Sequence, residues 1–188
     1  MADITLEAKP LLGGFDKDFG GVHLKEATRL AIVSLAIPQG DDEACAKALK
    51  KAFRVAMPDN GRYTTSKEGV RVLRTQPDQL FVMMDRDTPD ARNHLHGETG
   101  SAFWTTEQTD NWCALELSGD MTRSVLERLC PIDLHPDVFG EDHLARTTME
   151  HMGAMILRTG DDSFLLMSAR SSSASFLHAI ETSIAYVL

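Results

Sequence analysis

The sequence predicts an α+β fold of two ferredoxin-like or split β-α-β halves that pack as one unit, with antiparallel sheets covered by helices on one face. In each half a strand-like apolar segment precedes an amphipathic helix, and two further strands then flank a turn signal. Because the chain has 188 residues, each half alone would have a thin core. We therefore expect an N-terminal arm over 1–21 and a single domain over 22–188, with halves at about 22–108 and 112–188.

The first half begins with an apolar strand over 27–37, which Pro38 and Gly40 end. Asp41, Asp42 and Glu43 then open a helix, because acidic side chains are favoured at the positive end of the helix dipole. The other expected features are a helical stripe at Cys45, Ala48, Leu49, Ala52 and Phe53, strands at 70–74 and 80–84 joined by a turn at 75–79, a short helix starting at 88–90, and a last strand at 101–106.

The second half repeats this order. Residues 112–117 alternate as a strand with one buried face, and Asp120 is the expected N-cap of the helix that follows. Pro131 ends that helix because proline has no N–H to donate. The other expected features are a helical stripe at Met121, Val125, Leu126 and Leu129, strands at 143–149, 154–158 and 164–167, a turn at 159–162, and a final helix capped within 171–173 with a stripe at Phe176, Leu177, Ile180, Ile184 and Val187.

Four large apolar side chains stand in the arm between flexible glycines: Leu11, Leu12, Phe15 and Phe19. Such side chains are costly to leave in water, so we expect this segment to dock, and these four residues are the predicted partner interface. The spacing of the glycines fits neither common phosphate-binding motif.

Composition narrows the class of protein. A formal net charge of -9 disfavours nucleic acid and anionic membranes as partners, since both attract a positive field. The longest apolar run, residues 30–37, is too short to span a membrane, and the first residues lack the pattern of a signal peptide. Three widely spaced cysteines favour buried thiols in a reducing cytoplasm over a disulfide framework or a zinc site.

A search for catalytic groups finds none with a recognised spacing. Asp133, His135 and His143 lie close in sequence, yet no metal-binding pattern accompanies them, and a structural role in bonding loop amides is expected for Asp133 and His135. Cys45 and Cys130 lie on or beside apolar helix faces, which disfavour a thiolate. We therefore assign no catalytic, cofactor-binding or metal-binding residue to this chain.

Four short strings stand out along the chain: Leu117-Ser118-Gly119 before a helix, the run Cys-Pro-Ile-Asp-Leu-His-Pro at 130–136 followed by Phe139, Pro10-Leu11 in the arm, and Pro38 with Gly40. With these strings the chain resembles, over nearly its whole length, the gamma subunit of heterotetrameric sarcosine oxidase. The hairpin at 72–81 departs from the family pattern, because it keeps the Pro-Asp turn and lacks two tryptophans that the family carries there.

The resemblance implies the fold of the folate-binding domain of the glycine-cleavage T-protein. It also implies an assembly of alpha, beta, gamma and delta subunits that oxidises sarcosine to glycine, produces hydrogen peroxide and passes the one-carbon unit to tetrahydrofolate. In that family FAD, FMN and NAD lie on the alpha and beta subunits and zinc lies on delta, while gamma carries no known catalytic group. The implied role is a non-catalytic subunit that docks on alpha.

Two alternatives come from the same fold group. A stand-alone folate-binding protein or aminomethyltransferase-like enzyme would be about twice as long, with a further C-terminal barrel, as that family's pattern implies. A folate-dependent iron–sulfur assembly protein would need the string Lys-Gly-Cys-Tyr-x-Gly-Gln-Glu, which does not occur here. A vestigial folate pocket and the identity of the N-methylated amine stay open.

Overall fold

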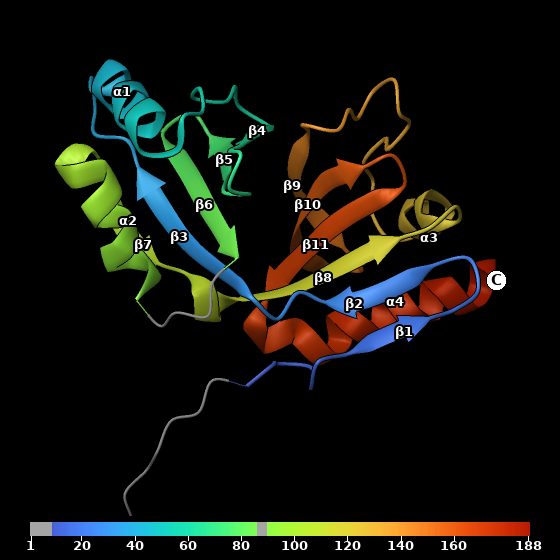
Figure 1. Ribbon diagram of the computed structural model, residues 1–188. Helices are drawn as coiled ribbons and strands as arrows, with labels where there is room; N and C mark the ends of the chain where they lie inside the picture. The colour runs from blue at the N-terminus through green and yellow to red at the C-terminus, as the bar shows by residue number, and fades with distance from the viewer. Residues whose placement is uncertain (1–8, 86–89) are drawn as a thin grey trace, which may run out of the picture.

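Two antiparallel sheets face each other, and helices cover the outer side of each (Figure 1). The computed structural model describes residues 9–85 and 90–188. The first sheet has the strand order β4-β5-β6-β3-β7, and the second has the order β1-β2-β8-β11-β10-β9. We call them the first sheet and the second sheet below.

The first sheet comes from the first half of the chain, as expected. Its strand β3 (Leu30–Ala36) is buried on both faces, which explains its continuous apolar sequence. Helix α1 turns three side chains at helical spacing toward the sheet, and these include Cys45 and Leu49. The remaining elements are α1 (Asp42–Phe53), β4 (Arg62–Thr65), β5 (Arg71–Gln76), β6 (Gln79–Asp85), α2 (Ala91–Thr99), a short 3-10 turn at Gly100–Ala102, and β7 (Trp104–Glu107).

The second sheet joins the second half of the chain to a segment near the N-terminus. Its strands are β1 (Asp16–Asp18), β2 (His23–Glu26), β8 (Trp112–Ser118), β9 (Leu144–Met149), β10 (Met152–Gly160) and β11 (Ser163–Ala169). Its helices are α3 (Thr122–Glu127) and α4 (Ser173–Val187), and 3-10 turns lie at Thr109–Asn111 and Arg170–Ser172.

The two sheets have matching topologies. Reading each from one edge gives β7-β3-β6-β5-β4 and β2-β8-β11-β10-β9, with every neighbouring pair antiparallel. In the first sheet, β7 is the strand beside β3. In the second sheet, the corresponding place beside β8 is taken by β2, which lies near the N-terminus. The prediction of an α+β fold with two ferredoxin-like halves is therefore confirmed, with an N-terminal strand completing the second one.

Three clusters of buried apolar residues form the core. One lies between the second sheet and helices α3 and α4, and another lies between the first sheet and helices α1 and α2. The third, which we call the inter-sheet cluster, joins the sheets face to face. Its buried members are Ile32, Leu73, Phe81 and Met83 from the first sheet and Ala114, Leu144, Met155, Leu157, Leu165 and Met167 from the second.

The predicted N-terminal caps of two helices need correction. Met121, and not Asp120, occupies the N-cap position of α3, and no side chain caps this end. The start is set instead by the backbone, because Gly119 accepts from the Thr122 amide and Gly21 accepts from the Met121 amide. Helix α4 begins where expected, yet Ser172 at its N-cap position makes no side-chain capping bond.

Other differences concern short or polar segments. The predicted arm contains strand β1, and strands β2 and β4 were not expected. The last strand of the first half starts at Trp104, after a 3-10 turn. The predicted helix start at 88–90 lies mostly outside the described residues, and α2 begins at Ala91. The division into an arm and one two-part domain stays a prediction.

Within the described residues, none of the helices has the length and hydropathy needed to cross a lipid bilayer.

Gly119 is expected to be essential to the start of α3. Its φ of +121° disfavours any L side chain, and a Cβ built there would lie 2.5 Å from the carbonyl oxygen of Gly21. We expect Gly119→Ala to lower the free energy of unfolding by at least about 1–3 kcal/mol, measured by urea denaturation. Gly153→Ala is the matched control, because a Cβ at Gly153 meets no atom within 4 Å. Equal losses for the two variants would contradict this reading.

Candidate functional site: the polar junction and the groove between the sheets

The four residues of the predicted partner interface lie along the second sheet. Leu11, Leu12, Phe15 and Phe19 are half-buried and pack against the core cluster that the second sheet forms with α3 and α4. The chain itself therefore covers part of their apolar surface, which reduces the unfavourable free energy of exposing it to water. Contact with a partner through their exposed parts stays a prediction.

A buried carboxylate fixes this N-terminal segment. Glu26 is only 5% exposed, and its two carboxylate oxygens accept hydrogen bonds from the amides of Leu12 at 2.9 Å and Gly14 at 2.8 Å. The Glu26 amide donates in turn to the Phe15 carbonyl at 2.7 Å. A charged acceptor for two backbone donors is a strong anchor, so the described part of the segment is held against the body.

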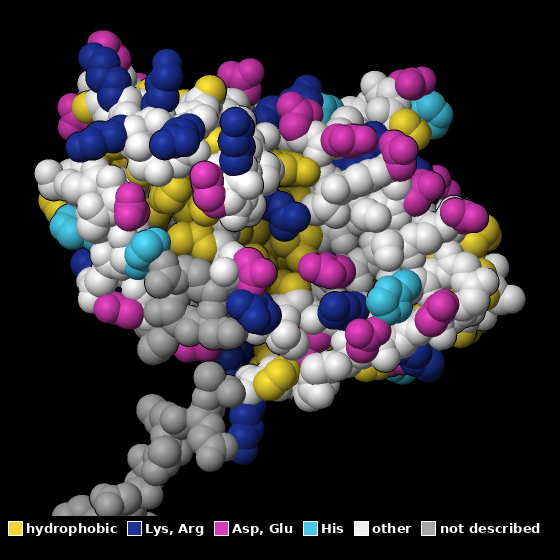
Figure 2. Space-filling view, viewed as in Figure 1, with side chains coloured by type: hydrophobic (Ala, Val, Ile, Leu, Met, Phe, Trp, Pro, Cys, Tyr) yellow, Lys and Arg dark blue, Asp and Glu magenta, His cyan; other side chains and the backbone are white. Residues whose placement is uncertain are grey.

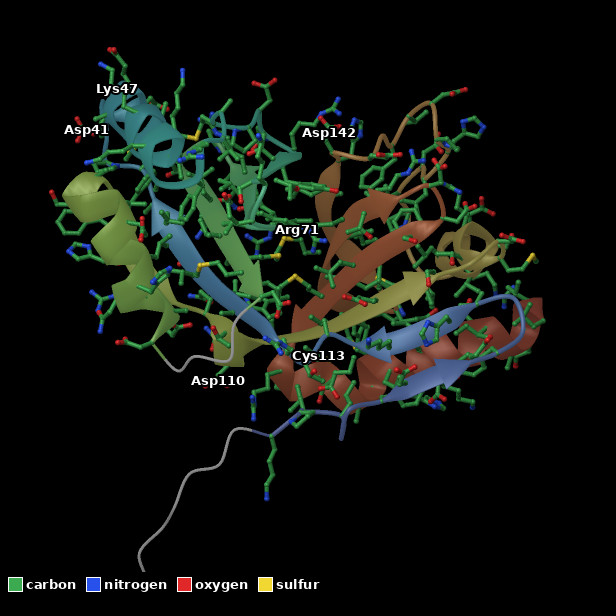
Figure 3. All side chains as sticks on the ribbon, in the orientation of Figure 1. Asp41, Lys47, Arg71, Asp110, Cys113 and Asp142 are labelled. Carbon is green, nitrogen blue, oxygen red and sulfur yellow. The ribbon has the colours of Figure 1, made fainter. Side chains whose placement is uncertain are left out.

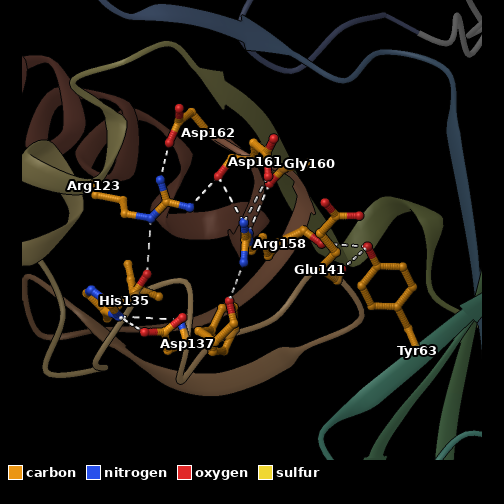
Figure 4. A network of polar contacts seen from close by, with 11 residues as sticks. Tyr63, Arg123, His135, Asp137, Glu141, Arg158, Gly160, Asp161 and Asp162 are labelled. Carbon is orange, nitrogen blue, oxygen red and sulfur yellow. Dashed lines mark hydrogen bonds and ion pairs between the residues drawn. The ribbon is translucent and has the colours of Figure 1, made fainter.

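The segment 130–139, which carries the most specific of the resemblance strings, is held by two arginines (Figure 4). Leu134 and Phe139 are buried, and their carbonyls accept hydrogen bonds from the side chains of Arg123 at 3.1 Å and Arg158 at 2.9 Å. Within the loop, the Asp133 carboxylate accepts from the amide of His135 at 2.9 Å, and the His135 Nδ1 accepts from the amide of Asp137 at 3.3 Å. The expected structural role of both side chains in bonding loop amides is confirmed.

Both arginines also meet the turn between β10 and β11. Arg123 forms an ion pair with Asp162 and donates to the carbonyl of Asp161. Arg158, which is 5% exposed, donates to the carbonyls of Gly160 at 3.1 Å and Asp161 at 3.3 Å. A planar guanidinium has five donors in a fixed geometry, so each arginine can join the loop to the turn. The outer face of this loop is consequently presented on a rigid base.

Tyr63 connects this junction to the first sheet. Its hydroxyl lies within hydrogen-bond reach of the carbonyl oxygens of Glu141, at 2.6 Å, and Arg158 (Figure 4). Burial raises the pKa of the Tyr63 hydroxyl, which therefore keeps its proton and donates it. Beside it, the amide of Tyr63 donates to the carbonyl of Asp142 at 2.9 Å, and that of Leu144 donates to Gly61 at 3.0 Å. These contacts fix how the two sheets sit relative to each other.

A groove opens where the sheets face each other. Figure 2 shows hydrophobic atoms at the surface between the two halves, with a Lys or Arg side chain among them, and Figure 3 labels Arg71 between the two sheets. On the side of the second sheet, a cavity of about 510 Å³ is lined by Trp112, Arg146, Thr147, Gly153, Ala154 and Ala169. We call the space between the sheets, with this cavity and the Arg71 side chain, the inter-sheet groove.

The wall of this groove combines an aromatic ring with a polar group that lacks a partner. The Trp112 ring meets the Phe81 ring of the opposite sheet edge-on, with centroids 5.9 Å apart. The indole Nε1 of Trp112 is buried and makes no hydrogen bond within the part of the chain that the structure describes.

The remaining candidate groups show no arrangement for chemistry. Burial raises the pKa of Cys45 and of Cys113 to about 11 each, and burial also raises the pKa of Cys130, so the thiolate forms are disfavoured at neutral pH. Across residues 9–85 and 90–188, no three His, Cys, Asp or Glu side chains stand where they could hold a metal ion. The expectation that this chain carries no catalytic residue stays a prediction.

Arg71, Arg146 and Tyr63 were missed by the sequence analysis. The only signal in the sequence was a charged or polar side chain at an inward position of an otherwise apolar strand, as at Arg71 two residues before Leu73. Which residues meet across the groove depends on the pairing of strands from both halves, which the sequence did not reveal.

The Tyr63 hydroxyl is expected to stabilise the junction. We expect Tyr63→Phe to lower the free energy of unfolding by about 1–2 kcal/mol, because carbonyls beside the ring lose their donor. Chemical denaturation followed by circular dichroism measures this change. Tyr186→Phe is the control, because Tyr186 is 73% exposed and its loss should change stability by less than about 0.5 kcal/mol. An unchanged Tyr63→Phe midpoint would refute the role.

His143 is expected to make the fold sensitive to acid. Burial first, and then the charge of Arg62, lower the pKa of His143, while Asp142 acts in the opposite direction. Because the folded state favours the neutral ring, its contribution is present above the unfolded pKa of about 6.5 and is lost as the pH falls through the lower folded value. The unfolding free energy should therefore drop between pH 7.5 and 5.5, and less so in His143→Gln. Parallel profiles of the two proteins would contradict this.

Comparisons with known proteins identify relatives of this chain. No protein-family model matches it. The gamma subunit of sarcosine oxidase from an Arthrobacter species is 29% identical over 150 residues, which cover 79% of this chain and 72% of that protein. The gamma subunit from Corynebacterium sp. strain P-1 is 28% identical over 161 residues, covering 85% of this chain and 78% of that protein.

Solved structures share the fold. A chain of the heterotetrameric sarcosine oxidase from Corynebacterium sp. U-96 superposes with a TM-score of 0.77 at 24% identity, covering 88% of this chain and 85% of that one. The glycine cleavage system aminomethyltransferase T from Bartonella henselae gives a TM-score of 0.62 at 12% identity, covering 85% of this chain and 45% of that one. The expected likeness to the T-protein fold is confirmed, and the sequence matches confirm that this chain resembles the gamma subunit of heterotetrameric sarcosine oxidase.

Proposed function

We propose that this chain is the gamma subunit of a heterotetrameric sarcosine oxidase and contributes structure, not catalysis, to that complex. The observation that carries the proposal is the similarity to two curated gamma subunits over most of both chains. The shared fold with a chain of a heterotetrameric sarcosine oxidase supports it.

The proposal includes the reaction of the whole complex. Sarcosine would be demethylated oxidatively to glycine, with formation of hydrogen peroxide and transfer of the one-carbon unit to tetrahydrofolate. FAD, FMN, NAD and zinc would be bound by other subunits. The described residues of this chain offer no metal-ligand cluster, and their cysteine thiols have raised pKa values, which suits a subunit without a redox or hydrolytic role.

The proposed partners are the alpha subunit, by direct contact, and beta and delta within the same cytoplasmic complex. The exposed parts of Leu11, Leu12, Phe15 and Phe19 are proposed to contribute to the subunit surface. Because Glu26 holds this segment against the body, these side chains would meet a partner with little loss of conformational entropy.

A stand-alone folate-binding or aminomethyltransferase-like enzyme is the competing function. The likeness to the Bartonella henselae enzyme supports a common fold and no more at 12% identity, and this chain spans 45% of that protein. The competing function would require the isolated chain to bind tetrahydrofolate with one-to-one stoichiometry.

Affinity purification of the tagged chain from its native cells tests the proposal. We expect a complex with flavin absorbance that produces hydrogen peroxide from sarcosine, measured with a coupled peroxidase, and no turnover by the chain expressed alone. Mock-purified material from untagged cells is the control. Recovery of the chain without other subunits, or stoichiometric tetrahydrofolate binding by the isolated chain, would overturn the assignment.

A further inference from the structure

Two arginines face the inter-sheet groove without a counter-charge. Arg71 on β5 and Arg146 on β9 make no hydrogen bond or ion pair across residues 9–85 and 90–188. Some other arginines of this chain, such as Arg62 and Arg123, pair with aspartates, while Arg128 lies over the ring of Tyr186. Arg71 is half-buried and Arg146 is exposed, and both lie beside apolar side chains in a protein with a net charge of -9.

Strand register places the Arg71 side chain on the inner face of the first sheet. Arg71 lies opposite Met83, and Met83 lies opposite Ile32 in the next strand. Both of these neighbours belong to the inter-sheet cluster. Residues directly opposite each other project to the same face, so Arg71 projects toward the second sheet, where Figure 3 shows its label. It is half-buried there.

Register places Arg146 on the inner face of the second sheet in the same way. Arg146 lies opposite Met155, which lies opposite Met167. Both methionines belong to the inter-sheet cluster, and Arg146, which is exposed, lines the cavity of about 510 Å³ beside Trp112. Register therefore places the two arginines on the facing inner sides of the two sheets.

The two arginines favour a binding partner with negative charge in the groove. A guanidinium that loses water needs acceptors, and carboxylates bind it in a bidentate manner. Glu116 is an acid on the inner face of the second sheet, where strand register places it opposite Lys25. Register places no acid directly opposite either arginine: Arg71 lies opposite Thr65 and Met83, and Arg146 lies opposite Met155.

We propose that the inter-sheet groove receives an acidic, extended segment of a neighbouring subunit, whose carboxylates pair with Arg71 and Arg146 while its apolar side chains cover the exposed lining. This inference rests on the proposed function, because it names the surface of this chain that a larger subunit meets. Charge complementarity is its main support, since apolar surface alone would accept many segments.

The shape of the groove favours a chain segment over a compact ligand. Figure 2 shows the hydrophobic atoms continuing along the boundary between the halves, and not gathered in a closed pit. An extended segment presents alternate side chains to opposite walls, which suits two arginines carried by two facing sheets.

Charge reversal tests the proposal in the complete complex. The Arg71→Glu and Arg146→Glu chains are purified separately, and their affinity for the subassembly of the other subunits is measured by biolayer interferometry at low and moderate salt. We expect at least a tenfold weaker affinity for each variant, with a reduced salt dependence. Lys50→Glu on the outer face of α1 changes the net charge equally and should leave the affinity unchanged.

Each possible result decides one question. If wild-type chain fails to bind the subassembly, the proposed function and this inference both fall. If wild type binds and the Arg71→Glu and Arg146→Glu variants bind equally well, this inference falls and the proposed function stands. Arg71→Leu, which keeps the apolar stem, should show an intermediate loss with an unchanged melting temperature, and a fall in melting temperature without loss of affinity would assign the arginine a folding role instead.

A small-molecule site is the remaining outcome. Benzoate, an apolar carboxylate, is titrated into the isolated chain and then into the complex. In one outcome, benzoate requires Arg71 for binding and binds the complex as tightly as it binds the isolated chain. That result would show that the groove stays open to solvent after assembly, and it would overturn the docking of a segment there. Benzoate binding that disappears on assembly supports it.

Discussion

Side chains from both sheets interleave along one shared face, and this contact carries the rest of the structure. Strands β3, β6, β10 and β11 are buried on both sides because each has a helix layer on one face and the opposite sheet on the other. Apolar contacts set no unique orientation by themselves, however. The hydroxyl of Tyr63 and the bridged backbone around Gly61 and Leu144 add directional bonds, which select one arrangement of the two sheets.

The N-terminal segment and the loop after α3 serve this arrangement in different ways. Strand β2 supplies the neighbour that β8 lacks within its own half, and Glu26 fastens the preceding residues. The loop is fixed by Arg123 and Arg158, so its outer residues keep their positions although they are exposed. Such rigidity suits the structural role proposed above, because a preformed surface loses less entropy when it binds.

Much of the fold followed from the sequence, because long apolar strands and amphipathic helices have strong periodic signals. Strands β2 and β4 did not, since they are short, polar in part, and defined by partners distant in the chain. Asp120 matched the usual N-cap chemistry, yet the close approach of Gly119 to Gly21 moved the start of α3. The groove could not be predicted from the sequence, because Arg71 and Arg146 face the same space only after the strands have paired and the two sheets have packed together.

The pairing of β2 with β8 has a consequence for synthesis in the cell. A ribosome makes β2 early, while its partner strand emerges only after the whole first half has been translated. Until then Val22 and Leu24, which are both buried in the folded protein, lack the neighbours against which they pack. Closure of the second sheet therefore requires a non-local encounter between β2 and β8, and until it occurs the apolar side of β2 is exposed to aggregation.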